Sequence, residues 1–127
     1  MRHRVGFMQG RLSPPVNHRV QAFPNESWRE EFPLAARAAL RIMEWTLDQH
    51  RLHENPLLNS AGQAEIGALS RHHELTVHSL TGDCFMQAPF WKTQGIERGA
   101  LQRDFLEVVR ACAAGGLTMV VLPLVRH

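Results

Sequence analysis

Cysteine is scarce in this chain, and no run of apolar residues is long. The two cysteines, Cys84 and Cys112, fall in different predicted elements and lack C-x-x-C spacing, so neither a disulfide framework nor a structural zinc site is expected. The apolar stretch over residues 111–125 is interrupted by glycine and proline, and the N-terminus shows no cleavable leader pattern. We therefore expect no transmembrane helix and no signal peptide, and the reducing cytoplasm is the expected location.

An excess of charge of one sign is also lacking. Lysine and arginine together number 14 against 12 acidic residues, for a formal charge of +2, and the arginines are scattered along the chain. This balance provides no polybasic patch for nucleic acid or for a membrane surface. We expect neither as a partner.

The fingerprints of several enzyme classes are absent. The chain has no G-x-S-x-G, no P-loop and no dinucleotide-binding glycine pattern. Cys84 follows Asp83, whose negative charge would raise the pKa of the thiol. Nucleophilic catalysis therefore finds no support.

What the chain does contain is a regular alternation of strand-like and helix-like segments. Its 127 residues, 44% of them hydrophobic, suit one domain over residues 1–127 or a part of a larger one. Apolar runs predict strands at residues 5–8, 41–47, 76–80 and 118–122. Capping and spacing patterns predict helices from near Ser27, from Ser60 to near residue 73, and over residues 97–114.

This order predicts an α/β fold with a parallel sheet of about four βα units. A complete (β/α)8 barrel takes about 250 residues, so we expect a partial TIM barrel, its N-terminal half. The first and last strands would be open edges, and such edges favour self-association.

Six strings of the sequence carry a family resemblance. They are GFMQGRLSPP (residues 6–15), QAFPNESWREEF (21–32), MEWTLD (43–48), ENPLL (54–58), SLTGDCFM (79–86) and VVLPLV (120–125). In combination they resemble the xylose isomerase-like TIM-barrel superfamily, and within it the sugar phosphate isomerases/epimerases. The resemblance implies a barrel that binds a small sugar or sugar phosphate and moves a proton beside a carbonyl with the help of a divalent metal.

The sequence departs from that family in two ways. The family's metal ligands lie at the ends of later barrel strands, so the complete fold is expected to bind Mn, Mg or Co, whereas this chain is expected to bind none. Residues 38–41 (AALR) also stand where such sequences tend to have a glycine-containing turn. That corner is expected to be built differently.

The long loops after the first and third strands hold the candidate substrate-binding residues, because barrel sites lie at the carboxyl ends of the strands. Arg11 suits a phosphate or hydroxyl clamp, and the aromatic residues suit walls for the apolar face of a sugar. The alternative is that the aromatic residues only pack at the barrel mouth. The candidates are Gln9, Arg11, Phe23, Asp83, Phe85, Met86 and Trp91.

Glu44 is the candidate catalytic residue. Strand alternation places it on the face opposite Met43 and Trp45, whose bulk suits the helix-covered exterior. Glu44 would then point into the barrel, where a carboxylate suits hydrogen bonding to substrate hydroxyls or acid/base work. The alternative is a structural glutamate paired with an arginine or with loop amides. Asp48, just beyond the strand, is expected to brace its loop.

The eight histidines predict no metal site by spacing alone. His50 and His53 lie three apart beside Glu54, but no third ligand follows at a diagnostic interval. His78 alternates with Thr76 and Leu80 along the third strand. This position allows it to face the barrel lumen, but it suits a core histidine better.

The leading functional hypothesis is a sugar or sugar-phosphate isomerase/epimerase, with no or very weak turnover by this chain alone. A half-barrel module for binding or assembly is the first alternative. A DNA-repair endonuclease on the same barrel is the second, and the near-neutral charge disfavours it.

Overall fold

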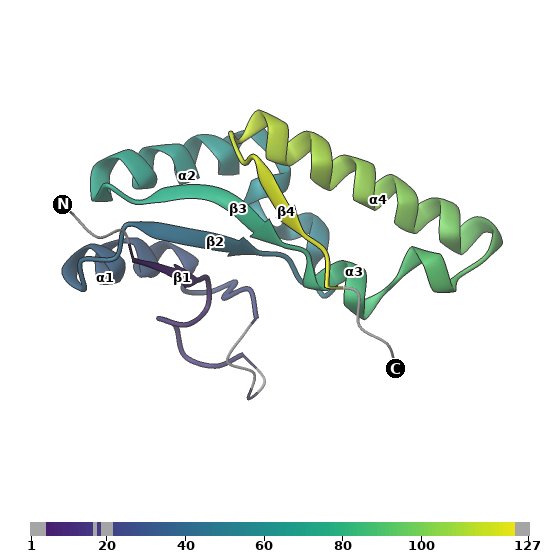
Figure 1. Cartoon of the computed structure of the whole chain (residues 1–127), viewed down its shortest axis with the longest axis horizontal. Helices are drawn as coiled ribbons and strands as arrows, with labels where there is room; N and C mark the ends of the chain where they lie inside the picture. The colour runs from purple at the N-terminus through teal and green to yellow at the C-terminus, as the bar shows by residue number, and fades with distance from the viewer. Residues whose placement is uncertain (1–4, 17, 19–21, 124–127) are drawn as a thin grey trace.

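The computed structural model describes residues 5–16, 18 and 22–123 of the chain, shown as a ribbon in Figure 1. Residues 17 and 19–21 of the predicted first loop lie outside the described residues, as do residues 124–125 of the last family string. The elements are β1 (Gly6–Met8), η1 (Trp28–Glu30), α1 (Glu31–Arg37), β2 (Ile42–Thr46), η2 (Leu52–Glu54), η3 (Pro56–Leu58), α2 (Ser60–His73), β3 (Thr76–Thr81), α3 (Asp83–Gln87), η4 (Phe90–Lys92), α4 (Gly95–Ala114) and β4 (Met119–Val121), where η marks a 3-10 turn.

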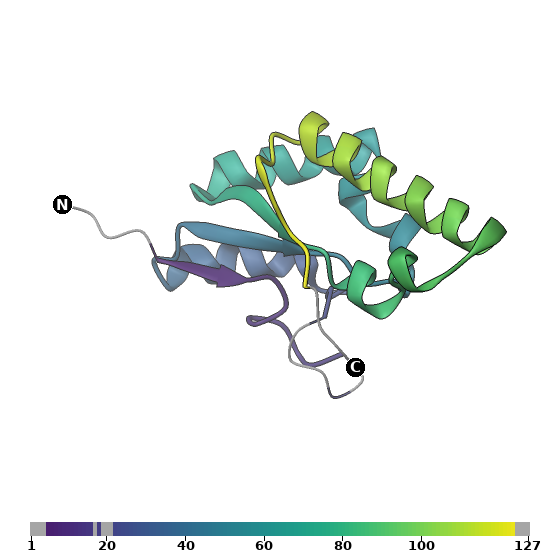
Figure 2. The ribbon, with the colours of Figure 1, turned by 45° about the vertical axis from the view of Figure 1, so that its right-hand side comes forward.

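The four strands form one parallel sheet in the order β1-β2-β3-β4. Consecutive strands are therefore neighbours, as in a (β/α)8 barrel, whereas doubly wound sheets reverse their strand order part-way. Helices α1, α2 and α4 lie on one face of the sheet, and the other face is left without a helix in the described part of the chain (Figure 2). The predicted α/β class with parallel βα units is confirmed.

The hydrophobic core lies between the sheet and these helices. Met43 and Trp45 are fully buried there, as their alternation along β2 predicts. The Trp45 ring packs against Phe23 and Trp28, at centroid distances of 5.7 and 5.8 Å, and its Nε1 donates to the buried Asn55 side chain over 3.0 Å. Because its polar atom is satisfied, the indole is buried at little cost.

A β-bulge in β3 changes the expected faces of that strand. Met43 pairs with Val77 and Glu44 with Ser79, so His78 is an extra residue without a partner in β2. The simple alternation of Thr76, His78 and Leu80 is therefore wrong, and Leu80 is fully buried on the helix side. The bulge turns Ser79 and Thr81 to the same face as Glu44.

Three helices end in the same C-terminal motif. The amide of Leu40 donates to Ala35 O, that of Leu75 to Ser70 O and that of Leu117 to Cys112 O. The residue before each leucine is in the left-handed region, with φ of 60° at Ala39, 53° at Glu74 and 78° at Gly116. The glycine-free corner at residues 38–41 is thus built with a left-handed alanine.

The helix starts differ in detail from the capping patterns. Helix α2 is capped by Asn59, whose side chain accepts from the Gly62 amide over 2.6 Å, and not by Ser60. Ser27 makes no side-chain capping bond, and the α-helix proper begins at Glu31, because Pro33 is tolerated only in a first turn. Among the described residues, no helix has the length and apolar character needed to cross a membrane.

Candidate functional site

The carboxyl ends of β2 and β3 bring Glu44 and Thr81 together on the uncovered face of the sheet. The Thr81 hydroxyl donates to Oε2 of Glu44 over 2.5 Å. Glu44 is half-buried, whereas Thr81 is buried, so the carboxylate is the part of the pair that reaches the surface. Its Oε1 has no hydrogen-bond partner in the part of the chain that the structure describes, which leaves it open to accept from a ligand.

Gln9 and Thr46 form a second polar pair, at the carboxyl ends of β1 and β2. The Gln9 side-chain oxygen accepts from the Thr46 amide over 3.0 Å, and the Thr46 hydroxyl donates to the Gln9 carbonyl over 3.3 Å. Gln9 is fully buried, and its Nε2 finds no hydrogen-bond partner among the described residues. A buried amide donor without a partner costs free energy, and its burial keeps it out of reach of a ligand in this structure.

The turn after β1 is organised around a buried carboxylate. Both oxygens of Glu31 accept from the Gly10 amide at 3.0 Å, and Oε2 also accepts from the Leu12 amide at 3.0 Å. Burial raises the pKa of Glu31, while the hydrogen bonds from these amides oppose the rise. The turn needs glycine at position 10, where φ is 100° and a Cβ would lie 2.4 Å from the Ala22 carbonyl oxygen. Because Glu31 occupies these amides, they are not available to a ligand phosphate.

The predicted substrate-binding residues are dispersed. Gln9 lies beside the Glu44 strand, whereas Arg11 is exposed on the turn after β1. Phe23 and Phe85 are in the core, where Phe23 packs on Trp45 and Phe85 packs on Phe105 of α4.

The remaining candidates follow β3. Asp83 is buried in the first turn of α3, and Met86 is half-buried in the same helix. Trp91 is exposed and packs edge-on against Phe90. Phe23 and Phe85 thus pack in the core, whereas Trp91 stays exposed beside Phe90.

Asp48 and Cys84 have structural environments. The Asp48 carboxylate accepts from the Phe23 amide over 2.7 Å and from the Gln87 side chain over 3.1 Å, so it braces two loops as expected. Burial raises the pKa of the Cys84 thiol from 9.0 to about 12, and the charges of Asp48 and Asp83 add to the effect. The thiol is therefore protonated at neutral pH, in line with the expected lack of a cysteine nucleophile. Both cysteines are free and buried, and no disulfide joins them.

Three polar side chains of the uncovered face had no sequence signal of function. Thr46, Ser79 and Thr81 are common residues in strands, and two of them face Glu44 only because of the bulge at His78. In so short a strand, a one-residue bulge cannot be recognised from the alternation of apolar and polar residues. Thr46 lies on this face because it alternates with Glu44 along β2.

The metal of the resembling family does not fit the strand ends of this chain. Among the described residues there, Glu44 offers one free oxygen, Asp48 is held by two loops, and no histidine joins them to complete a ligand set. The converging group of metal-ligating side chains in the described residues is elsewhere, at His53, Asp104 and Glu107.

Comparison with known proteins adds no family to these observations. No protein-family model matches the chain, and no curated protein matches it. The structure thus shows the fold, whereas the family resemblance stays an expectation from the sequence.

Proposed function

We propose that this chain is a partial (β/α)8 barrel that contributes the binding wall for a small sugar or sugar phosphate, in an enzyme of the isomerase/epimerase class. The observation that carries the proposal is the Glu44–Thr81 pair at the carboxyl ends of β2 and β3, on the face of the sheet without helices. In parallel βα folds this end of the sheet is where ligands bind.

The chemistry of the pair suits a polyhydroxylated ligand. Oε1 of Glu44 can accept from a sugar hydroxyl, and the bond from Thr81 holds the carboxylate in one orientation. The Nε2 of Gln9, at the neighbouring strand end, is buried and is not exposed to a ligand in this structure. Because a sugar hydroxyl can donate to the Glu44 carboxylate, this strand end favours such a ligand over an apolar one.

The described residues supply binding and orientation but not a complete reaction centre. Isomerisation and epimerisation beside a carbonyl require a base, an acid and stabilisation of the developing negative charge. Of these, the strand ends of this chain offer one surface carboxylate, Glu44. We therefore expect no or very weak turnover by the purified chain with Mn²⁺ and a panel of ketoses and ketose phosphates.

Binding can be tested separately from turnover. Titration of the chain with ketoses and their phosphates, followed by NMR, is expected to perturb residues at the carboxyl ends of β1 to β3. Glu44→Gln removes a charged hydrogen bond of about 1.5 to 3 kcal/mol and should weaken binding about 10- to 100-fold. Glu97→Gln, at an exposed position in the first turn of α4, is the matched control and should bind as the wild type does. Equal affinity of the wild type and Glu44→Gln, or no binding of any sugar, would contradict the proposal.

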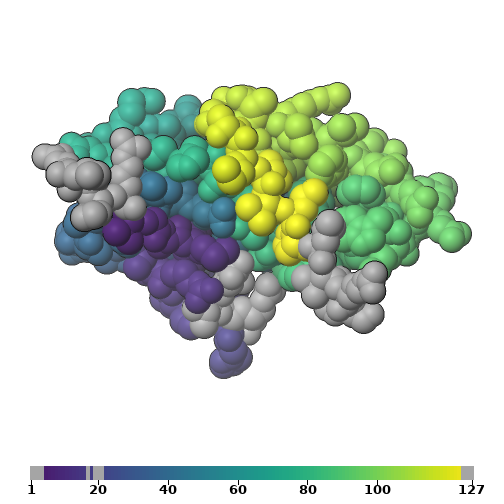
Figure 3. All heavy atoms as spheres, viewed as in Figure 1, coloured from purple at the N-terminus to yellow at the C-terminus, as the bar shows by residue number. Residues whose placement is uncertain are grey.

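A second candidate function, assembly with further βα units, is favoured by the distribution of exposed apolar residues. Met119 and Val121 on β4 are 56% and 41% exposed, and Val5 beside β1 is exposed at the opposite edge. Figure 3 shows β1 (purple) and β4 (yellow) on one face of the molecule, with atoms of β2 (blue) between them. A second copy that paired with these edges would cover the apolar side chains and satisfy the edge backbone groups.

A further inference from the structure

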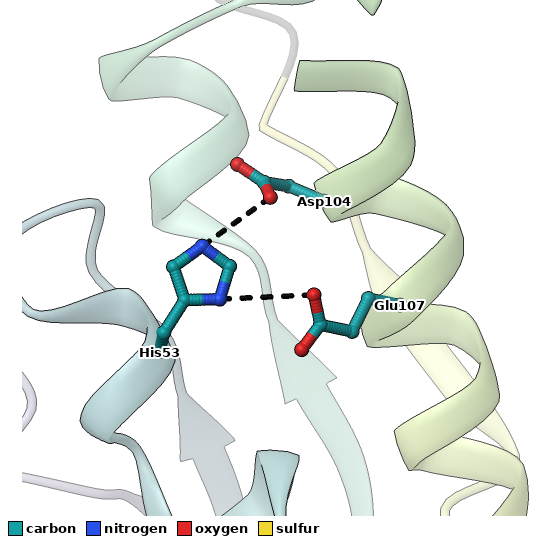
Figure 4. Close-up of side chains that lie close together, drawn as sticks. All are labelled: His53, Asp104 and Glu107. Atoms are coloured by element: carbon teal, nitrogen blue, oxygen red, sulfur yellow. Dashed lines mark ion pairs between the residues drawn. The ribbon is translucent and has the colours of Figure 1, made fainter. Parts of the chain in front are cut away.

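Three metal-ligating side chains from two distant segments meet on the helix side of the sheet. His53 of η2 lies with its Nε2 at 3.3 Å from Asp104 Oδ1 and its Nδ1 at 3.7 Å from Glu107 Oε2 (Figure 4). One potential ligand atom from each of the three residues lies within 4.8 Å of the others. Since α4 packs on the helix-covered face, this cluster is separated by the sheet from Glu44.

The two carboxylates are not neutralised by arginine. Asp104 and Glu107 form no ion pair with lysine or arginine in the described ranges, and the nearby Arg51 is engaged by Glu54 and Glu26. With a neutral imidazole, the form that binds metals, the three side chains carry two negative charges. A divalent cation would balance these charges.

The spacing also suits a shared metal ion. Two donors about 2.1 Å from a tetrahedral zinc lie about 3.4 Å apart, close to the 3.3 Å between His53 Nε2 and Asp104 Oδ1. Glu107 faces Nδ1, the other ring nitrogen, so its side chain must rotate to share an ion with Nε2 and Asp104. The side chain is 48% exposed, and one ligand atom of each residue already lies within 4.8 Å of the others, so the required movement is small. The exposure of His53, at 61%, leaves room for water in a fourth position.

The backbone on both sides of the cluster is held by the core. Leu52 and Leu57 are buried on either side of the His53 turn, and Val108 is buried beside Glu107. Asp104 and Glu107 are three residues apart on α4, and this spacing places them on one side of the helix. Ligands on such fixed elements lose little conformational entropy when they bind an ion.

We propose that His53, Asp104 and Glu107 form a site for a divalent transition-metal ion, with zinc the best match, which links the β2–α2 connection to α4. One nitrogen and two carboxylate oxygens leave a position for water, as in open zinc sites. Magnesium, which prefers six oxygen ligands and keeps its waters, should bind poorly.

Thermal unfolding of the metal-free chain with added ZnCl2 tests the site. Zinc should raise Tm by roughly 5 to 10 °C when the free ion exceeds its Kd about 100-fold, and MgCl2 at the same concentration should not. His53→Ala and Asp104→Asn should each weaken zinc binding, measured by competition with a chromophoric chelator, about tenfold or more. Substituted Co²⁺ should show the visible absorption of a four-coordinate ion in the wild type and lose it in both variants.

The matched control is His50→Ala, which removes an exposed histidine three residues from His53 and should bind zinc as the wild type does. A double variant, His72→Ala with His73→Ala, tests the adjacent histidine pair at the end of α2. Zinc binding that survives His53→Ala, or that is lost in either control, would overturn the assignment. Absence of any zinc effect on the wild type would also overturn it and leave the cluster as an ion-pair network only.

Discussion

At the scale of single residues, the left-handed alanine at the end of α1 is a position where a substitution should raise the free energy of unfolding. Ala39 has φ of 60° in a position that Gly116 occupies, with φ of 78°, in the equivalent corner after α4. A left-handed conformation costs a residue with a Cβ about 1 to 2 kcal/mol, and the greater entropy of unfolded glycine offsets part of this. Ala39→Gly should therefore raise the free energy of unfolding by about 0.5 to 1 kcal/mol, measured by urea denaturation.

The neighbouring alanine provides the control for this prediction. Ala38 has φ of −87°, which any residue adopts, so Ala38→Gly should be neutral or destabilising by up to about 1 kcal/mol. If both glycine variants lower stability equally, the backbone at Ala39 is not a source of strain.

At the scale of elements, the turn after β1 should give the protein a measurable pH dependence. Burial raises the pKa of Glu31 above its usual value of 4.5, so the folded chain holds this proton more tightly than the unfolded chain does. The protonated Glu31 carboxyl makes its full contribution to the free energy of unfolding below pH 4.5. This contribution is lost as the pH rises through the raised pKa of the folded chain. Relative to the non-titrating Glu31→Gln variant, wild-type stability should fall over that window, by up to about 1.4 kcal/mol per pH unit.

Urea denaturation at a series of pH values measures the difference, and the exposed neighbour supplies its control. Glu30→Gln removes a carboxyl group at the adjacent position, outside the buried turn, and should leave the slope of the wild type unchanged. A wild-type slope equal to that of Glu31→Gln, or a slope of opposite sign, would contradict the burial argument.

The strands and helices were largely predictable, because buried strands and amphipathic helices show a regular spacing of apolar residues in the sequence. The faces of β2 followed from alternation, since Met43 and Trp45 are bulky and apolar whereas Glu44 is charged. The bulge at His78 was not predictable, because one extra residue in a six-residue strand leaves no periodic mark, and Thr81 was missed for that reason. The partners of His53 were missed because Asp104 lies about fifty residues away and only helix packing brings it near.

At the scale of the whole molecule, the sheet is an arc with two open edges. The described residues leave β1 and β4 each with one neighbour, and the apolar side chains of β4 are exposed on the face that also carries Glu44. Apolar surface beside unpaired backbone groups favours association. Twofold pairing of two copies would bring each β1 edge close to the partner's β4 edge and enclose both copies of the polar site.

We therefore expect the purified chain to be a dimer by multi-angle light scattering at tens of micromolar. Val121→Lys introduces a charge on β4 at the open edge and should raise the dimer Kd at least about tenfold, because the ammonium would have to be desolvated on pairing. Ile96→Lys is the matched control, since Ile96 is a fully exposed apolar residue in the first turn of α4 and not on the sheet, and this variant should dimerise as the wild type does. A wild-type chain that stays monomeric at these concentrations and unfolds in one cooperative transition would show that the open edges are stable in water, and pairing through β1 and β4 would then be wrong.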